Sequence, residues 1–450
     1  MEKILLIGSG GRDHAMAEAL AKDQDVNLYA AIAFRNPGIL RLAESFVATE
    51  SDINAVIDFA RKESINYCVV GPEKPLEDGI VDKLTQAGFP CASPSQEAAK
   101  IETDKAFMRS LLKRCKIPGQ IDYVETTSVE EAISFCERHN WQIVVKPVGL
   151  TAGKGVRVWG DHFNSPQEVR AYVEAILSQK ISGHEKVIIE ELLVGQEVTI
   201  HFFCDGNSAI PTPAIQDHKR AYDGDHGPNT GGMGSYSCAD GLLPFLSRED
   251  YDQACRIGQK VVEALKSKGT PFKGVLYGQF MLTAGGVKII EFNARFGDPE
   301  AINTLLLLRS SFSTICRKII EGTLTPEDVR FAPLASVVRY VVPEGYGTDP
   351  RSNQQVSIGE NEVKEAGSSL FFASCNLERD GQVSGEKTRI STTGSRTLAV
   401  AATAPDIFEA QRHTEEALLH IEGKVFHRKD IGTKEAIEMR VRLMEQLRRH

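Results

Sequence analysis

The stretch that most constrains this chain is Ile289–Glu300, which reads IIEFNARFGDPE. Its first five residues have the composition of a strand, and side chains along a strand alternate between its two faces. Glu291 and Asn293 therefore share one face. Ile290 and Phe292 are expected to point the other way, into a core. A carboxylate and an amide oxygen side by side are hard ligands, of the kind that hold Mg²⁺ near phosphates.

A charged turn follows this strand. Arg295 comes two residues after it, and Gly297, Asp298 and Pro299 then force a turn. A guanidinium is always charged and can bind two oxygens at once, which suits a phosphoryl group or a carboxylate substrate. The alternative for this stretch is a surface strand end with an ordinary Arg–Asp pair, and the stretch alone does not decide between the two.

The N-terminal residues show the pattern of a strand, a glycine turn and a helix start. Lys3–Ile7 is apolar, GSGGRDH occupies residues 8–14, and the residues after it favour a helix. Such a turn presents backbone N–H groups to an anion. A dinucleotide-binding turn needs glycine where Asp13 stands, and no acid follows the next strand to hold a ribose. The turn therefore favours a sugar phosphate over a nicotinamide cofactor, with a ligand-free structural turn as the alternative.

Two later strand ends carry groups suited to a sugar or a nucleotide. Gly71-Pro72-Glu73 follows the strand Tyr67–Val70, and loops at strand ends line the ligand crevice of open sheets. Glu73 is thus a candidate for sugar hydroxyls. Val187–Glu191 ends in two acids, which suits an adenine edge and a ribose diol. Acids that only solvate a strand terminus are an equally common outcome.

A glycine-rich loop follows the strand Ile143–Lys146 and reads PVGLTAGKGV over residues 147–156. Its glycines let the backbone bend over phosphates, and Lys154 supplies positive charge. Gly155 follows this lysine, so the loop is not of the G-x-x-x-x-G-K-[ST] type. Lys146, a second lysine at the end of the strand, strengthens the assignment to phosphates.

Residues 216–236, QDHKRAYDGDHGPNTGGMGSY, show neither helix nor strand periodicity. Loops of this length inside a domain are usually functional or disordered, and the methionine and tyrosines here argue against disorder. The two histidines match no zinc spacing. We expect an ordered substrate loop with Asp217, Lys219 and Arg220 as polar contacts.

The rest of the pattern predicts helices, a hairpin and a β-rich C-terminal region. Helices are expected at Ser95–Cys115, which contains Lys105, and at Ser128–His139, Ser247–Ser267, Ala301–Glu321 and Ile407–Ile421. A hairpin across Gly285-Gly286 would place Gln279 beside Glu291. Strands are expected at Ala335–Val342, Leu370–Cys375 and Thr397–Ala402. Thr433–Arg449 is predicted to be a charged helix, most simply a solvated appendage.

Composition limits the class of protein. Charged residues make up 25% and hydrophobic residues 42% of the 450, as in globular proteins of two to four domains. A net charge of −9 argues against nucleic-acid binding. The nine cysteines include no C-x-x-C pair, which indicates a reducing compartment. No apolar run could cross a bilayer, and no signal peptide precedes the first strand. We therefore expect a soluble, cytoplasmic protein that binds neither nucleic acid nor membrane.

Together the motifs resemble the phosphoribosylamine–glycine ligase (glycinamide ribonucleotide synthetase) family of the ATP-grasp superfamily. The resemblance runs through GGRDH, GPEKPL, GLTAGKGV, QDHKR, GPNTGGMG, EFNARFGDPE and RKDIG, in this order. It implies an α/β and α+β multidomain fold. An N-terminal open parallel α/β domain would cover 1–103, and an ATP-grasp core 104–330, with a mobile lid at about 120–190. A C-terminal αβ domain would cover 331–432, before the terminal helix at 433–450.

The resemblance also implies a reaction and its residues. Glycine and 5-phosphoribosylamine would be joined with ATP and Mg²⁺ or Mn²⁺, through a glycyl phosphate, in de novo purine biosynthesis, by a monomer or weak homodimer. The residues implied for ATP are Lys105, Lys146, Lys154, Glu190, Glu191, Leu193 and Glu197, and those implied for the metal are Gln279, Glu291 and Asn293. The residues implied for the substrates are Gly10, Gly11, Arg12, Asp13, His14, Gly71, Pro72, Glu73, Asp217, Lys219, Arg220, Gly231, Arg295 and Asp298, with Arg295, Lys146 and Asp217 as catalytic residues.

Three stretches depart from the family pattern. KPVGLTAGKGV stands where Ala-Asp is common after the first lysine, RNPGI replaces PGN-x-G at residues 35–39, and Ser93-Pro94 replaces Gly-Pro. The lysines are kept, so ATP use is implied, whereas the details of the sugar contacts stay open. The alternatives are another ATP-grasp carboxylate–amine ligase, a nicotinamide dehydrogenase built on the first glycine turn, and a catalytically silent ATP-binding regulator.

Overall fold

The computed structural model describes residues 1–149, 155–179, 185–377 and 387–449. Its N-terminal part is a four-stranded parallel sheet of order β3-β2-β1-β4. The elements here are β1 (Glu2–Ile7), α1 (Gly11–Ala21), β2 (Val26–Ala31), α2 (Pro37–Leu42), β3 (Ser45–Val47), α3 (Ile53–Glu63), β4 (Tyr67–Val70), α4 (Glu73–Glu77) and α5 (Ile80–Gln86). All of β4 and the last four residues of β1 are buried, as expected where helices cover both faces of a parallel sheet. The predicted open parallel α/β domain is confirmed.

The single helix predicted over Ser95–Cys115 was wrong. The structure has two helices, α6 (Gln96–Thr103) and α7 (Lys105–Arg114). Asp104 between them has an extended backbone, and its side chain accepts the N–H of Phe107 to cap α7. This preference of aspartate for the N-cap breaks the helix and makes Lys105 the first residue of α7.

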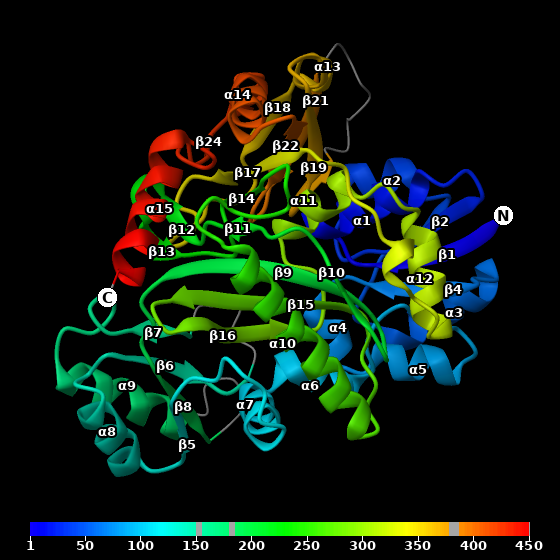
Figure 1. The fold of residues 1–450 in the computed structure, drawn as a ribbon. Helices are drawn as coiled ribbons and strands as arrows, with labels where there is room; N and C mark the ends of the chain where they lie inside the picture. The colour runs from blue at the N-terminus through cyan, green and yellow to red at the C-terminus, as the bar shows by residue number, and fades with distance from the viewer. Residues whose placement is uncertain (150–154, 180–184, 378–386, 450) are drawn as a thin grey trace.

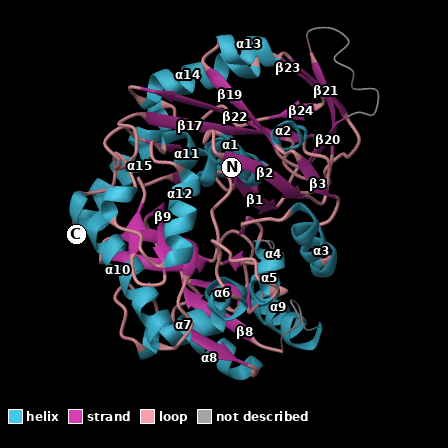
Figure 2. Cartoon of the chain, turned by 90° about the vertical axis from the view of Figure 1, so that its right-hand side faces the viewer, coloured by secondary structure: helices cyan, strands magenta, loops and turns pink. Residues whose placement is uncertain are grey.

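A small antiparallel sheet of order β5-β8-β6-β7 follows and has a hydrophobic core of its own. Its elements are β5 (Tyr123–Thr126), α8 (Val129–Arg138), β6 (Ile143–Pro147), β7 (Arg157–Val158), α9 (Pro166–Gln179) and β8 (Val187–Glu191). Ser128 caps α8 by accepting the N–H of Glu131, so the helix predicted over Ser128–His139 is confirmed. Figure 1 and Figure 2 both place this sheet at the end of the molecule opposite the C-terminal sheets.

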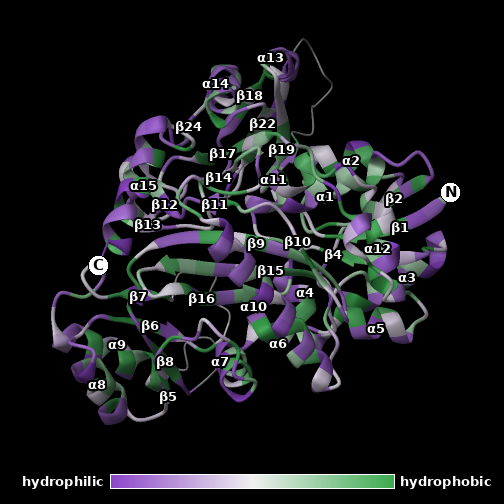
Figure 3. Cartoon of the chain, viewed as in Figure 1, coloured by the Kyte–Doolittle hydropathy of each residue, from purple (hydrophilic) through white to green (hydrophobic). Residues whose placement is uncertain are grey.

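The central sheet is antiparallel, with order β10-β9-β15-β16. It comprises β9 (Gln196–Asp205), β10 (Ala209–Pro211), β15 (Lys273–Thr283) and β16 (Gly286–Asn293), with the helices α10 (Arg248–Ser267), α11 (Glu300–Leu307) and α12 (Phe312–Glu321). Figure 3 shows both hydrophobic and hydrophilic residues along α10, whose buried residues include Ile257, Val261 and Leu265. The hairpin across Gly285-Gly286 is confirmed.

The helix predicted over Ala301–Glu321 is also interrupted. Leu308 pairs with Phe331 in an isolated β-bridge, and this contact ends α11. Ser311 then caps α12 by accepting the N–H of Thr314. A short break of this kind lies within an apolar run, so the helical period alone does not reveal it.

Residues 216–236 are more regular than predicted. They contain β11 (Gln216–Asp217), β12 (Arg220–Tyr222), the 3₁₀ turn η2 (Asp223–Asp225), β13 (His226–Asn229) and the start of β14 (Gly234–Ser237). β12 and β13 form a hairpin, while β11 and β14 extend the C-terminal sheet. Strands of two to four residues are too short for an alternating pattern to appear in the sequence.

The C-terminal part contains two antiparallel sheets. The first has order β11-β14-β17-β22-β19, with β24 also paired to β17, and the second has order β20-β21-β18-β23. Their remaining strands are β17 (Ala335–Pro343), β18 (Gln355–Ile358), β19 (Ser368–Phe372), β20 (Cys375–Leu377), β21 (Thr388–Thr392), β22 (Leu398–Ala404), β23 (Ile421–Gly423) and β24 (Val425–Phe426), and the helices are α13 (Glu360–Glu365) and α14 (Ile407–Leu418). The strands predicted at Ala335–Val342 and Thr397–Ala402 and the helix predicted from Ile407 are confirmed. The predicted strand Leu370–Cys375 instead covers the end of β19 and the first residue of β20.

The last helix, α15 (Lys434–Arg448), is not a solvated appendage, so that prediction was wrong. Ile437 and Met444 are buried, and Arg448 forms an ion pair with Asp250 on α10. The apolar residues are spaced seven apart, so they share the face that packs on the domain. In Figure 1 this helix lies beside β12 and β13.

Within the described part of the chain, no helix is long and apolar enough to span a membrane. All nine cysteines are free.

Two buried histidines join separate parts of the fold. His14 on α1 accepts the N–H of Phe372 at its Nδ1, at 2.8 Å, and so ties the N-terminal sheet to β19. His201 on β9 accepts the N–H of Gly297 at its Nε2, at 2.9 Å, and its Nδ1 lies 3.0 Å from the hydroxyl of Thr304 on α11. Burial lowers the pKa of both histidines to about 3.

These histidines should make the protein less stable in mild acid. Each binds a proton less readily when folded than when unfolded, where a histidine pKa is about 6.5. The free energy of unfolding should therefore fall as the pH drops from about 6.5 toward 3, by up to about 1.4 kcal/mol per pH unit for each histidine. Unfolding should be measured between pH 7 and 4.5 in the wild type and in His14→Asn, which keeps an acceptor for Phe372.

The slope of stability against pH should be smaller in His14→Asn than in the wild type. The same substitution at the exposed His226 controls for the change of side chain. Equal slopes in the wild type and His14→Asn would contradict a neutral, buried His14.

Candidate active site

The face of β16 that carries Glu291 is built by its pairing with β15. Glu291 lies opposite Gln279, as predicted. A β-bulge at this point leaves Ile290 as an extra residue in β16, so Ile289 and Phe292 are both buried and Ile290 is only half-buried. The expectation that Ile290 points into the core was therefore wrong.

Only one of the two polar atoms of the Gln279 side chain has a hydrogen-bond partner. Its Nε2 donates to Glu197 on β9, whereas its Oε1 is buried without a hydrogen-bond partner. A buried acceptor without a partner costs free energy, and such an oxygen beside a carboxylate indicates a place for a cation. With Glu291 and Asn293 it gives an all-oxygen donor set, which fits a hard divalent ion such as Mg²⁺.

This donor set contains a single carboxylate. Among the described residues, no group of three His, Cys, Asp or Glu side chains could hold a metal. A metal at Glu291 would therefore need further oxygen ligands from phosphates and water, as Mg²⁺ commonly has in nucleotide sites.

Four cationic side chains act on Glu291. They come from α7, β6, the segment after β11 and the turn after β16, and they are Lys105, Lys146, Lys219 and Arg295. Burial by itself would raise the pKa of Glu291, but these cations outweigh it and hold the pKa below its ordinary value. Glu291 is thus an ionised carboxylate in a strongly cationic surrounding.

Glu190 on β8 is buried between two cations. Lys146 Nζ lies 2.5 Å from its Oε2, and Arg109 approaches its Oε1 at 2.7 and 2.8 Å. Arg109 also donates to the carbonyls of Ile289 and Ile290, at 3.2 and 2.9 Å. These bonds link β8 to β16 and fix Lys146 beside Glu291. Glu190 was predicted to contact adenosine, but both of its carboxylate oxygens pair with Lys146 or Arg109.

The sequence analysis missed Arg109. The signal was present, because Arg109 lies three residues from both Ala106 and Leu112, on the buried face of α7. A charge on an apolar helix face is rarely buried without a partner.

The other residues predicted to contact ATP lie at the start of α7, around the end of β8 and at the start of β9. Lys105 Nζ donates to the carbonyl of Gly149 at 2.9 Å. Glu191 accepts the N–H of Asp122 at 2.9 Å, and Leu193 is half-buried after β8. Glu197 forms an ion pair with Lys219, at 3.0 Å. Lys154 lies outside the described residues.

Asp13 is wedged between the two glycine turns of the N-terminal sheet. Its carboxylate accepts the N–H of Gly10, at 2.7 Å. A Cβ on Gly8 would lie 2.4 Å from Asp13 Cγ, and a Cβ on Gly71 would lie 1.7 Å from its Oδ1. Both positions therefore require glycine, and Asp13 fixes the turns at Gly10–Gly11 and Gly71-Pro72 relative to each other.

Alternating charges connect the N-terminal sheet to the turn after β16. Arg12 donates to the carbonyl of Phe296 at 3.0 Å and lies 3.9 Å from Glu73. Arg295 lies between Glu73, at 3.3 Å, and Glu102, at 2.8 Å. Against burial, Arg295 and then Arg12 lower the pKa of Glu73 to about 2, whereas burial raises that of Glu102 to about 7. Glu102, on α6, was not predicted.

The three parts of the fold meet at Asp298. Its carboxylate accepts the hydroxyl of Tyr340, at 2.5 Å, and pairs with Arg396, at 3.0 Å. Arg396 also donates to the carbonyl of Gly231, at 2.6 Å. A Cβ on Gly11 would lie 2.1 Å from the Tyr340 hydroxyl, so the glycine turn also reaches this junction. Tyr340 and Arg396 were not predicted, because nothing local in the β-rich C-terminal sequence marks them.

Two neighbouring acids, the half-buried Asp217 and the buried Glu300, lie within electrostatic reach of each other and of Lys219. Burial raises the pKa of Asp217 to about 7, with Lys219 opposing and Glu300 adding to the rise. Burial also raises the pKa of Glu300, to which the hydroxyl of Thr199 donates at 3.3 Å. Such a pair suits a ligand with an ammonium group, because a cation would relieve the repulsion between the acids. The sequence analysis missed Glu300, which directly precedes the helix predicted over Ala301–Glu321.

Two residues that were predicted to contact the substrates, His14 and Arg220, have their side chains engaged elsewhere. His14 packs on Phe372 and lies where a Cβ on Gly38 would meet its ring, at 2.0 Å. Arg220 pairs with Asp161 and donates to the carbonyl of Gly227, at 2.9 Å. The expectation that these two side chains face the substrates finds no support in their contacts.

Removing Arg109 should destabilise the protein strongly. Arg109→Met leaves Glu190 with one cation in a buried place, and breaking a buried pair costs about 3 kcal/mol or more. Arg61→Met is the control, because its pair with Asp58 is exposed and worth at most about 1 kcal/mol. Chemical unfolding of both variants checks this. Equal losses, or a stable Arg109→Met, would contradict the bracing role.

Family models match the chain in three consecutive parts. The phosphoribosylglycinamide synthetase N domain matches residues 2–102, its ATP-grasp (A) domain matches 103–301, and its C domain matches 336–434. The phosphoribosylamine–glycine ligase of Methanothermobacter thermautotrophicus is 45% identical over 446 residues, which cover 99% of this chain and 100% of that protein. The protein of the same name from Pyrococcus furiosus is 41% identical over 449 residues, covering 100% and 98%.

Solved structures share the fold. A phosphoribosylamine–glycine ligase from Thermotoga maritima superposes with a TM-score of 0.79 at 24% identity, over 95% of this chain and 100% of that one. The biotin carboxylase domain of a Hydrogenobacter thermophilus 2-oxoglutarate carboxylase, crystallised with MgADP, gives a TM-score of 0.71 at 16% identity, over 99% and 94%.

Proposed function

Because this chain belongs to the phosphoribosylglycinamide synthetase family, we infer that it catalyses the phosphoribosylamine–glycine ligase reaction. It joins glycine to 5-phosphoribosylamine at the expense of ATP, giving glycinamide ribonucleotide, ADP and phosphate in purine biosynthesis. The observation that carries this function is the convergence of four cationic side chains on Glu291, at the end of a strand in the ATP-grasp domain.

The reaction needs this concentration of positive charge. The carboxylate of glycine attacks the γ-phosphoryl group of ATP, so two anions must approach each other before a bond can form. Lys105, Lys146 and Arg295 would neutralise them, and fixed charges in a buried site act without having to reorganise. ADP leaves, and the amine of phosphoribosylamine then attacks the acyl carbon of glycyl phosphate and displaces phosphate. No nucleophile from the protein is needed.

The protein uses ATP with a divalent cation, as ATP-grasp enzymes do, and we propose that the cation is Mg²⁺ or Mn²⁺. Glu291, Asn293 and the orphaned Oε1 of Gln279 would hold it. When bound, the metal draws charge from the phosphate oxygens and orients them. Lys146, braced by Glu190, would stay beside the transferring phosphoryl group.

The two substrates divide between the remaining clusters. We propose that Asp217 and Glu300 receive the ammonium of glycine, because a cation would relieve the repulsion between these neighbouring acids. We propose that the N-terminal turns, with Arg12, Asp13 and Glu73, face phosphoribosylamine. Asp13 would shape that site indirectly, because its carboxylate holds both glycine turns.

We also propose that the protein works in the cytoplasm as a monomer or weak homodimer. The domain limits at 103, 330 and 432 and the lid at about 120–190 stay predictions.

Phosphate release should depend on both substrates. With ATP and Mg²⁺, the protein should release phosphate fully only when glycine and freshly made phosphoribosylamine are both present, because the acyl phosphate needs the amine to turn over. Each component should be omitted in turn. Full release without glycine would reject this ligase in favour of one with another carboxylate substrate.

Glu291→Ala should reduce turnover by about 10³-fold or more, because it removes the only carboxylate of the metal site. Glu137→Ala, on the exposed face of α8, is the control and should keep wild-type turnover. Steady-state kinetics at saturating ATP and Mg²⁺ test this. Near-normal turnover in Glu291→Ala would remove Glu291 from the metal site.

A further inference from the structure

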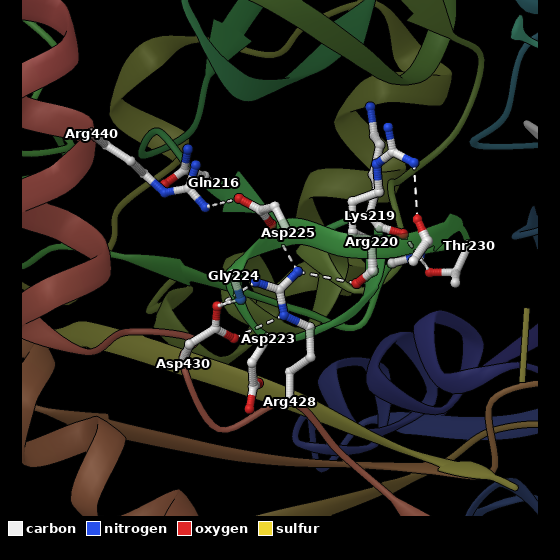
Figure 4. A network of polar contacts seen from close by, with 12 residues as sticks. Gln216, Lys219, Arg220, Asp223, Gly224, Asp225, Thr230, Arg428, Asp430 and Arg440 are labelled. Atoms are coloured by element: carbon white, nitrogen blue, oxygen red, sulfur yellow. Dashed lines mark hydrogen bonds and ion pairs between the residues drawn. The ribbon is translucent and has the colours of Figure 1, made fainter. Parts of the chain in front are cut away.

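A network of charged residues outside the active site joins the C-terminal end of the chain to the tip of the β12–β13 hairpin (Figure 4). The side chain of Arg428 is fully buried and binds both oxygens of Asp430, at 2.8 and 2.6 Å. It also donates to Asp225 Oδ1, at 2.8 Å, and to the carbonyl of Arg220, at 3.0 Å. Arg440 on α15 donates to Asp225 Oδ2, at 2.9 Å. One carboxylate, that of Asp225, therefore bridges two arginines.

The hairpin tip is held in an uncommon conformation by these contacts. Gly224 has a φ of +71°, and Asp225 has a φ of +57°, which residues other than glycine seldom adopt. The N–H of Gly224 donates to Asp430, at 2.9 Å, and the side chain of Asp223 accepts the N–H of Lys429, at 2.8 Å. The tip is thus shaped by residues about 200 positions later in the chain.

Residues 428–431, which contact the hairpin tip, are themselves bound to the C-terminal sheet. Arg339, buried in the middle of β17, donates to the carbonyls of Lys429 and Ile431, at 2.8 and 2.9 Å. The Nη1 of Arg339 pairs with Glu415 on α14. The segment that contains Arg428 and Asp430 is therefore fixed to β17, and a displacement of this segment would also displace the β12–β13 hairpin.

Lys219 and Glu197 form an ion pair whose side chains are partly exposed, and each arginine contacts a residue next to one member of this pair. Arg428 binds the carbonyl of Arg220, the residue after Lys219, and Arg440 binds the side chain of Gln196, the residue before Glu197, at 3.1 Å. Lys219 and Glu197 lie 3.0 Å apart, and Lys219 is one of the cations around Glu291. The arginines themselves make no contact with this pair.

We propose that Arg428 and Arg440 are positioning residues for the ligase reaction, which set Lys219 and Glu197 in place at Glu291 through the hairpin and Gln196. This inference rests on the proposed function. Arg428 is buried and Arg440 nearly so, whereas the carboxylate of Asp225 is 44% exposed, so these pairs add little net stability but can fix one geometry. Displacement of a reacting group by about 1 Å can cost 10²-fold in rate. Docking of α15 does not depend on Arg440, because the buried Ile437 and Met444 supply it.

Two variants test the network in the full-length protein. Asp225→Asn removes the bridging charge, and asparagine tolerates the same backbone conformation, so the tip can still fold. Arg440→Ala removes the outer arginine, whose side chain is 15% exposed. Arg448→Ala is the matched control, because it removes another arginine pair from the same helix away from the hairpin.

Asp225→Asn and Arg440→Ala should each lower kcat for glycine-dependent phosphate release by about 10-fold or more. Their melting temperatures should match that of Arg448→Ala, whose kcat should equal that of the wild type. Arg440→Lys should recover part of the rate, since it keeps the pair with Asp225 but not the second donor. Hydrogen exchange of the amides over 217–230, including that of Thr230, should be faster in the first two variants only.

Wild-type kcat and wild-type exchange in Asp225→Asn and Arg440→Ala would overturn the proposal, as would an equal loss of kcat in Arg448→Ala. A wild-type protein without glycine-dependent phosphate release would instead reject the proposed function. The hydrogen-exchange comparison would then still decide whether the two arginines hold the hairpin.

Discussion

Compensation of buried charge is the constraint on which this structure depends. Glu291 is half-buried, and cations from four separate segments hold its pKa below the ordinary value against the effect of burial. Those cations in turn are held by acids: Lys146 by Glu190, and Lys219 by Glu197. A buried charge without a partner is costly, so the segments that carry these groups must pack together for the site to exist.

The same rule explains how the parts of the fold are joined. Arg295 lies between Glu102 of α6 and Glu73, the first residue of α4, so the strand end that carries Glu291 is tied to the N-terminal domain. Arg396 ties the C-terminal sheet to Asp298, five residues beyond Asn293. The catalytic stretch is therefore positioned by every domain, although its own residues are contiguous in the chain.

Much of this could be predicted from the sequence. Local patterns gave the parallel N-terminal sheet, the hairpin that pairs Gln279 with Glu291, and the strands of the C-terminal region, because apolar periodicity and turn residues act over short distances. They failed at Asp104, where one capping residue splits a continuous helical pattern, and in the hairpin near Asp225, whose strands are too short to show a period. The role of α15 also depends on a packing partner that periodicity does not identify.

The residues that brace the site were harder to find. Arg109, Glu102 and Arg396 act through partners 80 to 200 residues away, so no local motif marks them.

The most direct test of the account is a crystal structure with ADP and Mn²⁺, in which anomalous scattering locates the metal. The account predicts a manganese ion within about 2.5 Å of the side-chain oxygens of Glu291 and Asn293, bridging to phosphate. Bound nucleotide with the metal elsewhere, or with none at that strand end, would contradict it.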